Sequence, residues 1–194
     1  RASHSRVSSS ACLVHREVSH DAGPRLEYTQ GEGEDTGVFL GAASALHDYG
    51  FTLDAARLAN EFALKSVPEP DRVRHLFQTI TDKFKGFEAI PLKGTYDPLT
   101  DTSPHPTVFV PRGSDNGITY AVCKLGGWLY DSSRGHALPF EAEADKMQSL
   151  NLAVRSLESD TTTYNGVMQI AKRFSGVRIV PSQKLLTALG KRKS

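Results

Sequence analysis

The sequence predicts an α+β domain in which an early group of helices packs on a late antiparallel sheet. Apolar side chains recur at helical spacing before Gly86, and short β-rich segments bounded by turn residues follow it. The composition, 39% hydrophobic and 23% charged over 194 residues, is typical of a globular chain. Helices first and strands later is the order of the α+β class.

Charge and cysteine content exclude several classes of protein. The chain has 23 Lys and Arg against 22 Asp and Glu, so its net charge of +1 gives no general attraction to nucleic acid or membranes. No apolar run approaches the roughly 18 residues of a membrane span, and we expect no membrane contact. The two cysteines, Cys12 and Cys123, form no disulfide framework and favour a reducing, intracellular compartment.

The two ends of the chain differ from its middle. We expect residues 1–25 to form a flexible arm, residues 26–190 the single α+β domain, and residues 191–194 a short basic tail. Residues 1–16 are rich in Arg and Ser and lack acidic residues, which is also typical of the mature edge of a mitochondrial transit peptide.

Three early helices are expected at residues 37–49, 53–65 and 71–84. Asp35 or Thr36 can cap the first, Thr52 the second and Asp71 the third, and Gly50, Pro68 and Gly86 follow their ends. Small residues, including Gly41, dominate the first helix. We therefore expect the late sheet to approach this helix closely.

The later elements are expected to be short strands with three further helices. Strands are predicted at 87–92, 107–110, 118–124, 128–130 and 177–180, with a loop at 93–106 and an extended segment at 152–157. The turns at 112–117 and 125–127 contain Asn-Gly and Gly-Gly and indicate hairpins. Helices are predicted at 141–149, at 164–174 and after Ser182.

Residues 30–37 (QGEGEDTG) and the small-residue helix behind them resemble the start of papain-like cysteine peptidases, including the Josephin and bacteriocin-processing branches. In that family a Gln precedes the catalytic Cys by about five or six positions, and the Cys opens the central helix. The resemblance implies that Gln30 matches the oxyanion Gln and that Thr36 stands at the position of the nucleophile. A shift of one residue would place Gly37 there.

Residues 118–131 (ITYAVCKLGGWLYD) resemble the family's strand pair that carries the catalytic His and then an Asn or Asp. The resemblance places Ile118, or Thr119 after a shift of one residue, at the His position and Asp131 at the orienting carboxylate. A Thr hydroxyl is a poor nucleophile without an adjacent base, and Ile supplies none. We therefore expect a site without chemistry, in which Asp131 is bonded to a backbone amide or to Arg134.

Other candidate chemistry is sparse in this sequence. Cys12 lies near His15 and His20 and offers an alternative thiol centre, whereas Cys123 has apolar neighbours and should be a core residue. The spacing of His, Cys and acidic residues fits neither a zinc nor a calcium site, and no phosphate-binding glycine motif occurs. We expect no metal and no cofactor.

The sequence thus favours an inactive papain-like domain that acts as a structural or adaptor component of a larger assembly, either a mitochondrial complex or a viral particle. Its expected partners are other protein subunits. One alternative is an active cysteine peptidase or deubiquitinase whose catalytic pair lies elsewhere in the chain. Another is an RNA-contacting accessory subunit that uses basic residues near the C-terminus.

Overall fold

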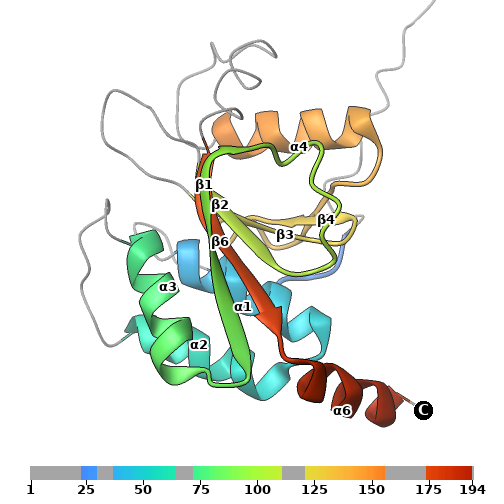
Figure 1. Cartoon of the computed structure of the whole chain (residues 1–194). Helices are drawn as coiled ribbons and strands as arrows, with labels where there is room; N and C mark the ends of the chain where they lie inside the picture. Colours follow the sequence, from blue (N-terminus) through green and yellow to red (C-terminus); the bar gives the residue numbers. More distant parts are fainter. Residues whose placement is uncertain (1–22, 30–36, 64–71, 111–120, 156–173, 194) are drawn as a thin grey trace, which may run out of the picture.

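A six-stranded antiparallel sheet forms the centre of the structure, with helices on both of its faces (Figure 1). The chain is described by a computed structural model for residues 23–29, 37–63, 72–110, 121–155 and 174–193. The predicted α+β class, with the helical part early and the sheet late, is confirmed.

The helices are α1 (Gly37–Tyr49), α2 (Thr52–Ala63), α3 (Arg72–Lys83), α4 (Glu143–Arg155) and α6 (Gln183–Lys193). The strands are β1 (Phe87–Tyr96), β2 (Thr107–Val110), β3 (Val122–Leu125), β4 (Trp128–Tyr130), β5 (Leu138–Pro139) and β6 (Phe174–Pro181). Their order across the sheet is β1-β6-β2-β3-β4-β5, so the last of the described strands lies between the first two of them. The first three helices closely match their predicted ranges, and the proposed caps Asp35, Thr36 and Asp71 lie outside the described residues.

The two faces of the sheet bury separate apolar clusters. Cys123 and Leu125 belong to the cluster on the α1 side, whereas Val122 belongs to the cluster that includes residues of α4. This division follows from the alternation of side chains along a strand. Cys123 is 1% exposed, so the prediction that it is a core residue is confirmed.

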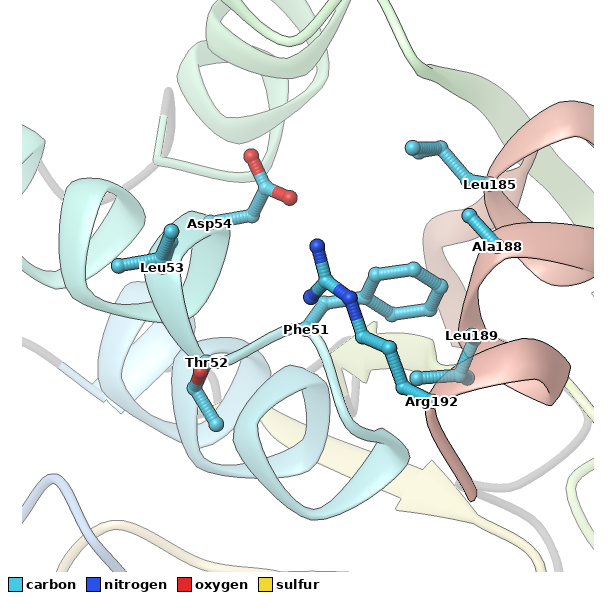
Figure 2. Close-up of a pocket in the computed structure, with 8 residues that line it drawn as sticks. All are labelled: Phe51, Thr52, Leu53, Asp54, Leu185, Ala188, Leu189 and Arg192. Atoms are coloured by element: carbon cyan, nitrogen blue, oxygen red, sulfur yellow. The ribbon is translucent and has the colours of Figure 1, made fainter. Parts of the chain in front are cut away.

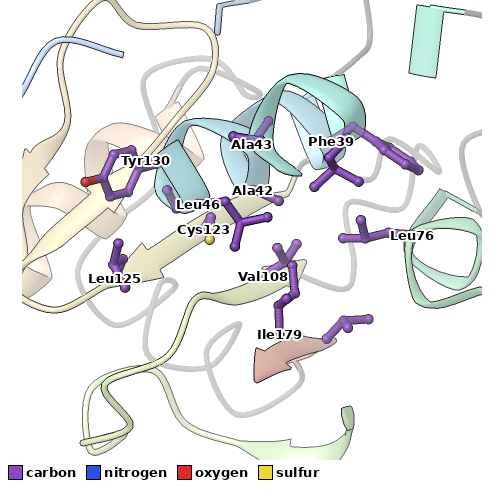
Figure 3. Close-up of a cluster of buried hydrophobic side chains, with 14 of the residues drawn as sticks. Phe39, Ala42, Ala43, Leu46, Leu76, Val108, Cys123, Leu125, Tyr130 and Ile179 are labelled. Atoms are coloured by element: carbon purple, nitrogen blue, oxygen red, sulfur yellow. The ribbon is translucent and has the colours of Figure 1, made fainter. Parts of the chain in front are cut away.

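Helix α1 is buried along most of its length (Figure 3). Its fully buried apolar side chains are Phe39, Ala42, Ala43, Ala45 and Leu46. A helix with apolar residues around its circumference can be stable only inside a core. The contacts of α1 with α2, α3 and strands β2, β3 and β4 provide that environment.

Gly41 allows α1 to approach the backbone of the sheet. A Cβ atom at Gly41 would lie 3.2 Å from the carbonyl oxygen of Tyr130 and 3.9 Å from the Cβ of Cys123. The predicted close contact between the small-residue helix and the late sheet is therefore confirmed.

Strands β3 and β4 form the predicted hairpin. Cys123 pairs with Tyr130 and Leu125 pairs with Trp128, so Leu125 belongs to the strand, and the turn is Gly126-Gly127. Gly126 has a φ of +56°, a conformation that favours glycine. The other predicted turn, at 112–117, and residues 118–120 of the predicted strand lie outside the described residues.

Strand β1 is longer than its prediction at 87–92. It continues to Tyr96, which pairs with Phe174 after a shift in register beyond Leu92. The predicted loop at 93–106 therefore begins only after Tyr96. Pairing with a long partner strand extended β1 through residues that carry no strand signal of their own.

Helix α4 also extends beyond its prediction at 141–149. The extended segment predicted at 152–157 is wrong in its described part, since α4 is helical through Arg155. Met147, Leu150 and Ala153 recur every three residues and are buried in the second cluster. Burial of this stripe explains why the helix continues.

Strand β6 is longer than the predicted strand at 177–180, because it pairs with β1 on one side and β2 on the other. The helix predicted at 164–174 is wrong at Phe174, the first residue of β6, and its other residues lie outside the described ones. Strand β5 has two residues and is too short to produce a pattern in the sequence.

Both ends of the predicted domain differ from the structure. The backbone amide of Ala137 donates to the carbonyl of Pro24, and that of Leu26 donates to Gly135, each at 2.9 Å. Residues 23–25 are thus part of the fold, and the predicted arm is wrong for them; residues 1–22 lie outside the described residues. Helix α6 runs through Lys193, so the predicted basic tail is helical over residues 191–193.

Replacing Gly41 by Leu should destabilise the protein by about 1–3 kcal/mol, because the larger side chain would push α1 away from Tyr130. Urea unfolding at equilibrium measures this change. Gly190→Leu is the matched control, since Gly190 is also helical but has no atom within 4 Å of the position of a Cβ. That variant should be neutral or more stable by up to about 1 kcal/mol. Equal stability of Gly41→Leu and the parent would contradict the close contact.

Candidate functional site

Of the four residues expected to mark a former catalytic site, the structure describes only Asp131. Gln30, Thr36 and Ile118 lie outside the described residues. The expectation that Thr36 and Ile118 face each other across a cleft therefore concerns residues that the structure does not describe. Asp131 directly follows β4, and Thr36 directly precedes α1 in the sequence.

The packing of α1 on the hairpin fixes where Asp131 lies along the helix. Gly41 is next to Cys123 and the carbonyl of Tyr130, whereas Asp48, near the end of α1, lines a cavity with Gly126 and Gly127 of the turn. Helix α1 therefore runs toward the turn. Asp131, at the opposite end of the hairpin, lies toward the N-terminal end of α1.

The carboxylate of Asp131 is buried and is bonded to its neighbours in the sequence. Its Oδ1 atom accepts hydrogen bonds from the backbone amide of Ser133 at 3.0 Å and from the hydroxyl of Ser133 at 2.6 Å. Its Oδ2 atom pairs with Nε of Arg134 at 3.3 Å. The prediction that Asp131 is bonded to a backbone amide or to Arg134 is confirmed for both groups.

Burial raises the pKa of Asp131 above its ordinary value, although Ser133 and Arg134 favour the charged form. Arg134 also donates to the carbonyl of Leu152 at 3.2 Å, which fixes the guanidinium over the carboxylate. The local contacts of Asp131 thus hold the loop after β4 in place.

Cys123 is unsuited to nucleophilic chemistry. Burial raises the pKa of its thiol to about 12, so the reactive thiolate is scarce at neutral pH. Cys12, the alternative thiol, and its neighbours His15 and His20 lie outside the described residues.

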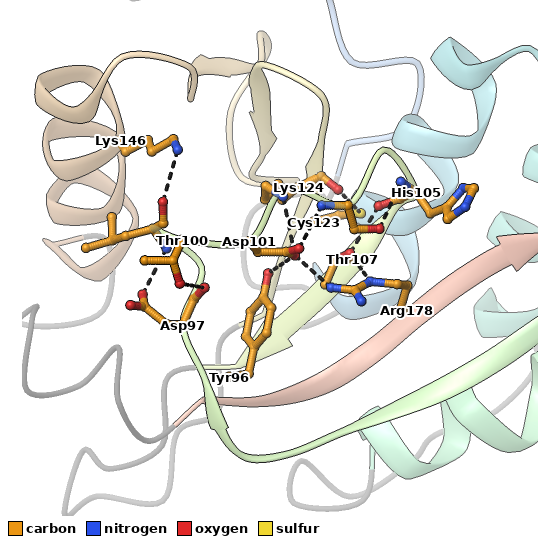
Figure 4. Close-up of polar contacts among 12 residues, drawn as sticks. Tyr96, Asp97, Thr100, Asp101, His105, Thr107, Cys123, Lys124, Lys146 and Arg178 are labelled. Atoms are coloured by element: carbon orange, nitrogen blue, oxygen red, sulfur yellow. Dashed lines mark hydrogen bonds and ion pairs between the residues drawn. The ribbon is translucent and has the colours of Figure 1, made fainter.

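A buried polar network lies on the α4 side of the sheet (Figure 4). At its centre, Oδ2 of Asp101 accepts hydrogen bonds from the hydroxyl of Tyr96 at 2.7 Å and from Arg178 at 2.9 Å, and lies 3.3 Å from Nζ of Lys124. Arg178 also donates to the hydroxyl of Thr107 at 3.2 Å. The side chains of Asp101 and Lys124 are only 8% and 4% exposed.

The role of this network is structural. Burial alone would raise the pKa of Asp101, but hydrogen bonds from Ser103 and Tyr96 and the charges of Lys124 and Arg178 hold it below its ordinary value. Burial lowers the pKa of Lys124, and Asp101 opposes that change. Because charges of opposite sign pair within the network, it fixes the loop after β1 to the sheet rather than presenting a reactive group.

Sequence reasoning missed this network, although one signal was present. Lys124 alternates with Cys123 and Leu125 in an apolar strand, so its side chain had to point to the other face of a buried sheet. A buried Lys requires a carboxylate partner. The partner, Asp101, lies in a loop whose position no local pattern predicts.

An apolar groove of about 110 Å³ lies between the start of α2 and helix α6 (Figure 2). Leu185 and Leu189 of α6 form one wall of the groove. Leu185 packs on Gly86, where a Cβ would lie 2.5 Å from its methyl group, and Leu189 packs on Gly50, where the distance would be 2.6 Å. Leu53, 76% exposed, and Arg192 line the groove from opposite sides. The space can accept one apolar side chain.

The described part of the chain holds neither a candidate metal centre nor a helix that could span a membrane. No group of three or more His, Cys, Asp or Glu residues there is placed to hold a metal ion. None of the helices described is long and apolar enough to cross a membrane.

Comparison of the chain with models of protein families, with curated proteins and with solved structures found no match. Its functional assignment accordingly depends on its own residues and their geometry.

Replacing Asp101 by Asn should cost about 3–5 kcal/mol of stability at neutral pH, because Lys124 and Arg178 would lose their buried counterion. The cost should depend on pH. The folded pKa of Asp101 lies below its ordinary value of 3.8, so its contribution is present above that value and is lost as the pH falls through the folded pKa. Urea unfolding of parent and variant between about pH 2 and 7 measures the difference.

Asp97→Asn is the control for this experiment, since Asp97 lies in the same loop and its Oδ1 accepts a hydrogen bond from the amide of Leu99 that Asn can keep. This variant should lose less than about 1 kcal/mol. If Asp101→Asn lowers the free energy of unfolding only slightly, or by the same amount at every pH, then the Asp101 network does not stabilise the fold through its ion pairs.

Proposed function

We propose that this chain is a papain-like domain that has lost peptidase chemistry and serves as a structural or adaptor component of a larger protein assembly. The observation that carries the proposal is the environment of Asp131. Asp131 lies toward the N-terminal end of α1, the helix at whose start the family resemblance places the nucleophile. Both of its carboxylate oxygens are nevertheless occupied, Oδ1 by Ser133 and Oδ2 by Arg134.

The arrangement of α1 and the hairpin supports the papain-like part of the proposal. The resemblance puts its two former catalytic positions at Thr36, before α1, and at Asp131, after β4. Helix α1 packs directly on the hairpin through Gly41, and its direction brings the start of α1 and the end of β4 to the same end of the packed pair.

The residue types support the loss of chemistry. A Thr at position 36 needs a neighbouring base, and the resemblance puts Ile118 where that base would stand. Cys123 is buried and its thiol has a raised pKa, so it cannot substitute.

The groove between α2 and α6 supports a role in assembly. It combines an exposed Leu53 with an apolar floor that takes one side chain. Lys184 and Arg192 of α6 are exposed, and Arg192 borders the groove. The occupant that fits this surface is a segment of a protein subunit with one apolar anchor and an acidic residue on the side of Arg192, away from Asp54, which lines the α2 side of the groove.

The purified chain should show no peptidase activity. We expect no labelling by a thiol-directed activity probe and no hydrolysis of ubiquitin-like or peptide substrates, because the reacting pair is absent. Thr36→Ala should leave this result unchanged and, if the hydroxyl caps α1, cost about 0.5–2 kcal/mol of stability.

Two variants distinguish the ways in which this prediction can be wrong. Hydrolysis by the parent that disappears in Thr36→Ala would place an active centre at the start of α1. Hydrolysis that survives Thr36→Ala but disappears in Cys12→Ala would place it in the N-terminal segment. Either result would overturn the loss of chemistry.

The chain should sediment with a large protein assembly in extracts of the cells that produce it. Leu53→Asp should move it to light fractions, because a carboxylate would enter an apolar contact. Ile90→Asp is the control: Ile90 is the other large exposed apolar residue among those described, 37% exposed, and lies on β1 away from the groove. Both variants are first shown to be folded by thermal unfolding.

Three results would contradict the role in assembly. The parent in light fractions would mean that no stable assembly forms, and equal behaviour of the two variants would exclude the groove. Release of the parent by ribonuclease, together with strong salt dependence, would favour the RNA-contacting alternative.

A further inference from the structure

A second, wider cavity lies where the end of α1 meets the turn between β3 and β4. Its volume is about 370 Å³, and its walls include Pro24, Asp48, Gly126, Gly127, Trp128 and Tyr130. None of the residues that line it takes part in the contacts of Asp131 with Ser133 and Arg134, in the Asp101 network or in the groove at α6.

The carboxylate of Asp48 gives this cavity a negative charge at an unusual place, the C-terminal end of a helix. Asp48 lies in the last turn of α1, where the helix dipole disfavours an anion. The hydroxyl of Tyr130 donates to its Oδ2 at 2.7 Å, and Nδ1 of His47 lies 3.3 Å from its Oδ1. The side chain of Asp48 is still 23% exposed, so part of the carboxylate remains accessible.

A second carboxylate, that of Glu141, lies beside Gly127, one of the residues that line the cavity, although Glu141 itself is not among them. Oε2 of Glu141 is 3.4 Å from the position that a Cβ of Gly127 would take. None of the described residues that line the cavity is Lys or Arg. The local field therefore favours a cation.

The turn also offers an aromatic surface and open access. Trp128 is half-buried and lines the cavity, and Trp rings bind cations better than other aromatic rings. Gly126 is exposed and has no atom within 4 Å of where its Cβ would lie, so the turn leaves the entrance open. A planar guanidinium can stack on an indole and pair with a carboxylate at the same time.

We propose that this cavity binds an arginine side chain of a partner protein, with Asp48 pairing with the guanidinium and Trp128 stacking on it. The proposal deepens the proposed assembly role and rests on it for the nature of the partner, but it does not depend on the loss of peptidase chemistry. It assigns to the partner a basic segment in addition to the acidic, apolar-anchored segment at α6.

The fluorescence of Trp128 provides the test, because it is the only Trp in the chain. The purified full chain is titrated at low, fixed ionic strength with the peptide acetyl-Gly-Arg-Gly-amide and with the same peptide carrying citrulline, the neutral analogue of Arg. We expect a saturable change in emission with the Arg peptide only. An equal response to citrulline, or no response to Arg, would overturn the proposal.

Asp48→Asn should weaken binding of the Arg peptide by about tenfold, which corresponds to about 1.4 kcal/mol. The Asn side chain can still accept the hydrogen bond from Tyr130, and thermal unfolding confirms that the variant is folded. Asp82→Asn is the matched control, since Asp82 is an exposed carboxylate in the last turn of α3 and lies outside the cavity. It should leave the affinity unchanged.

Two further results would contradict the assignment. Equal weakening by Asp48→Asn and Asp82→Asn would show that the peptide responds only to net charge. A Lys peptide that binds as tightly as the Arg peptide would exclude recognition of the planar guanidinium. Failure of this titration while the parent still sediments with an assembly would reject the cavity and leave the proposed function standing.

Discussion

The contact between α1 and the β3–β4 hairpin is the constraint on which the other parts of the structure depend. The contact is closest at Gly41, where a Cβ would lie 3.2 Å from the carbonyl oxygen of Tyr130, so a large side chain there would push the helix from the sheet. Once α1 is held there, α2 and α3 cover its remaining surface, and Asp48 is brought within reach of the Tyr130 hydroxyl. Asp131 lies at one end of this packed pair, and the cavity at the β3–β4 turn lies at the other.

The two faces of the sheet are stabilised in different ways. The α1 face is a continuous apolar cluster, whereas on the other face an apolar cluster borders the ion pairs of Asp101 with Lys124 and Arg178. Such pairs often gain little stability over apolar residues of similar volume. Here they join the loop after β1 to strands β3 and β6.

The sequence predicted the parts of the fold whose signals are local. Helix α1 and the hairpin around Gly126 were found from small residues, periodicity and turn residues, and the bonds of Asp131 were found because Arg134 is close in the chain. The extent of β6 and the partner of Lys124 depend on contacts between distant segments, which no local pattern carries. Of the four positions that the family resemblance implies, only Asp131 lies among the described residues, directly after β4.

The place of β6 in the sheet has a consequence for how the protein is made. In the described sheet, strands β1 and β2 are joined through β6, which begins only at Phe174, 64 residues after the end of β2 at Val110. A ribosome that has synthesised α1 to α4 and the first five strands, but not β6, therefore holds a sheet with a gap, in which two strands expose unpaired backbone groups. Completion of the domain must wait for the C-terminal segment, and nascent chains that stop before it are the species most exposed to aggregation.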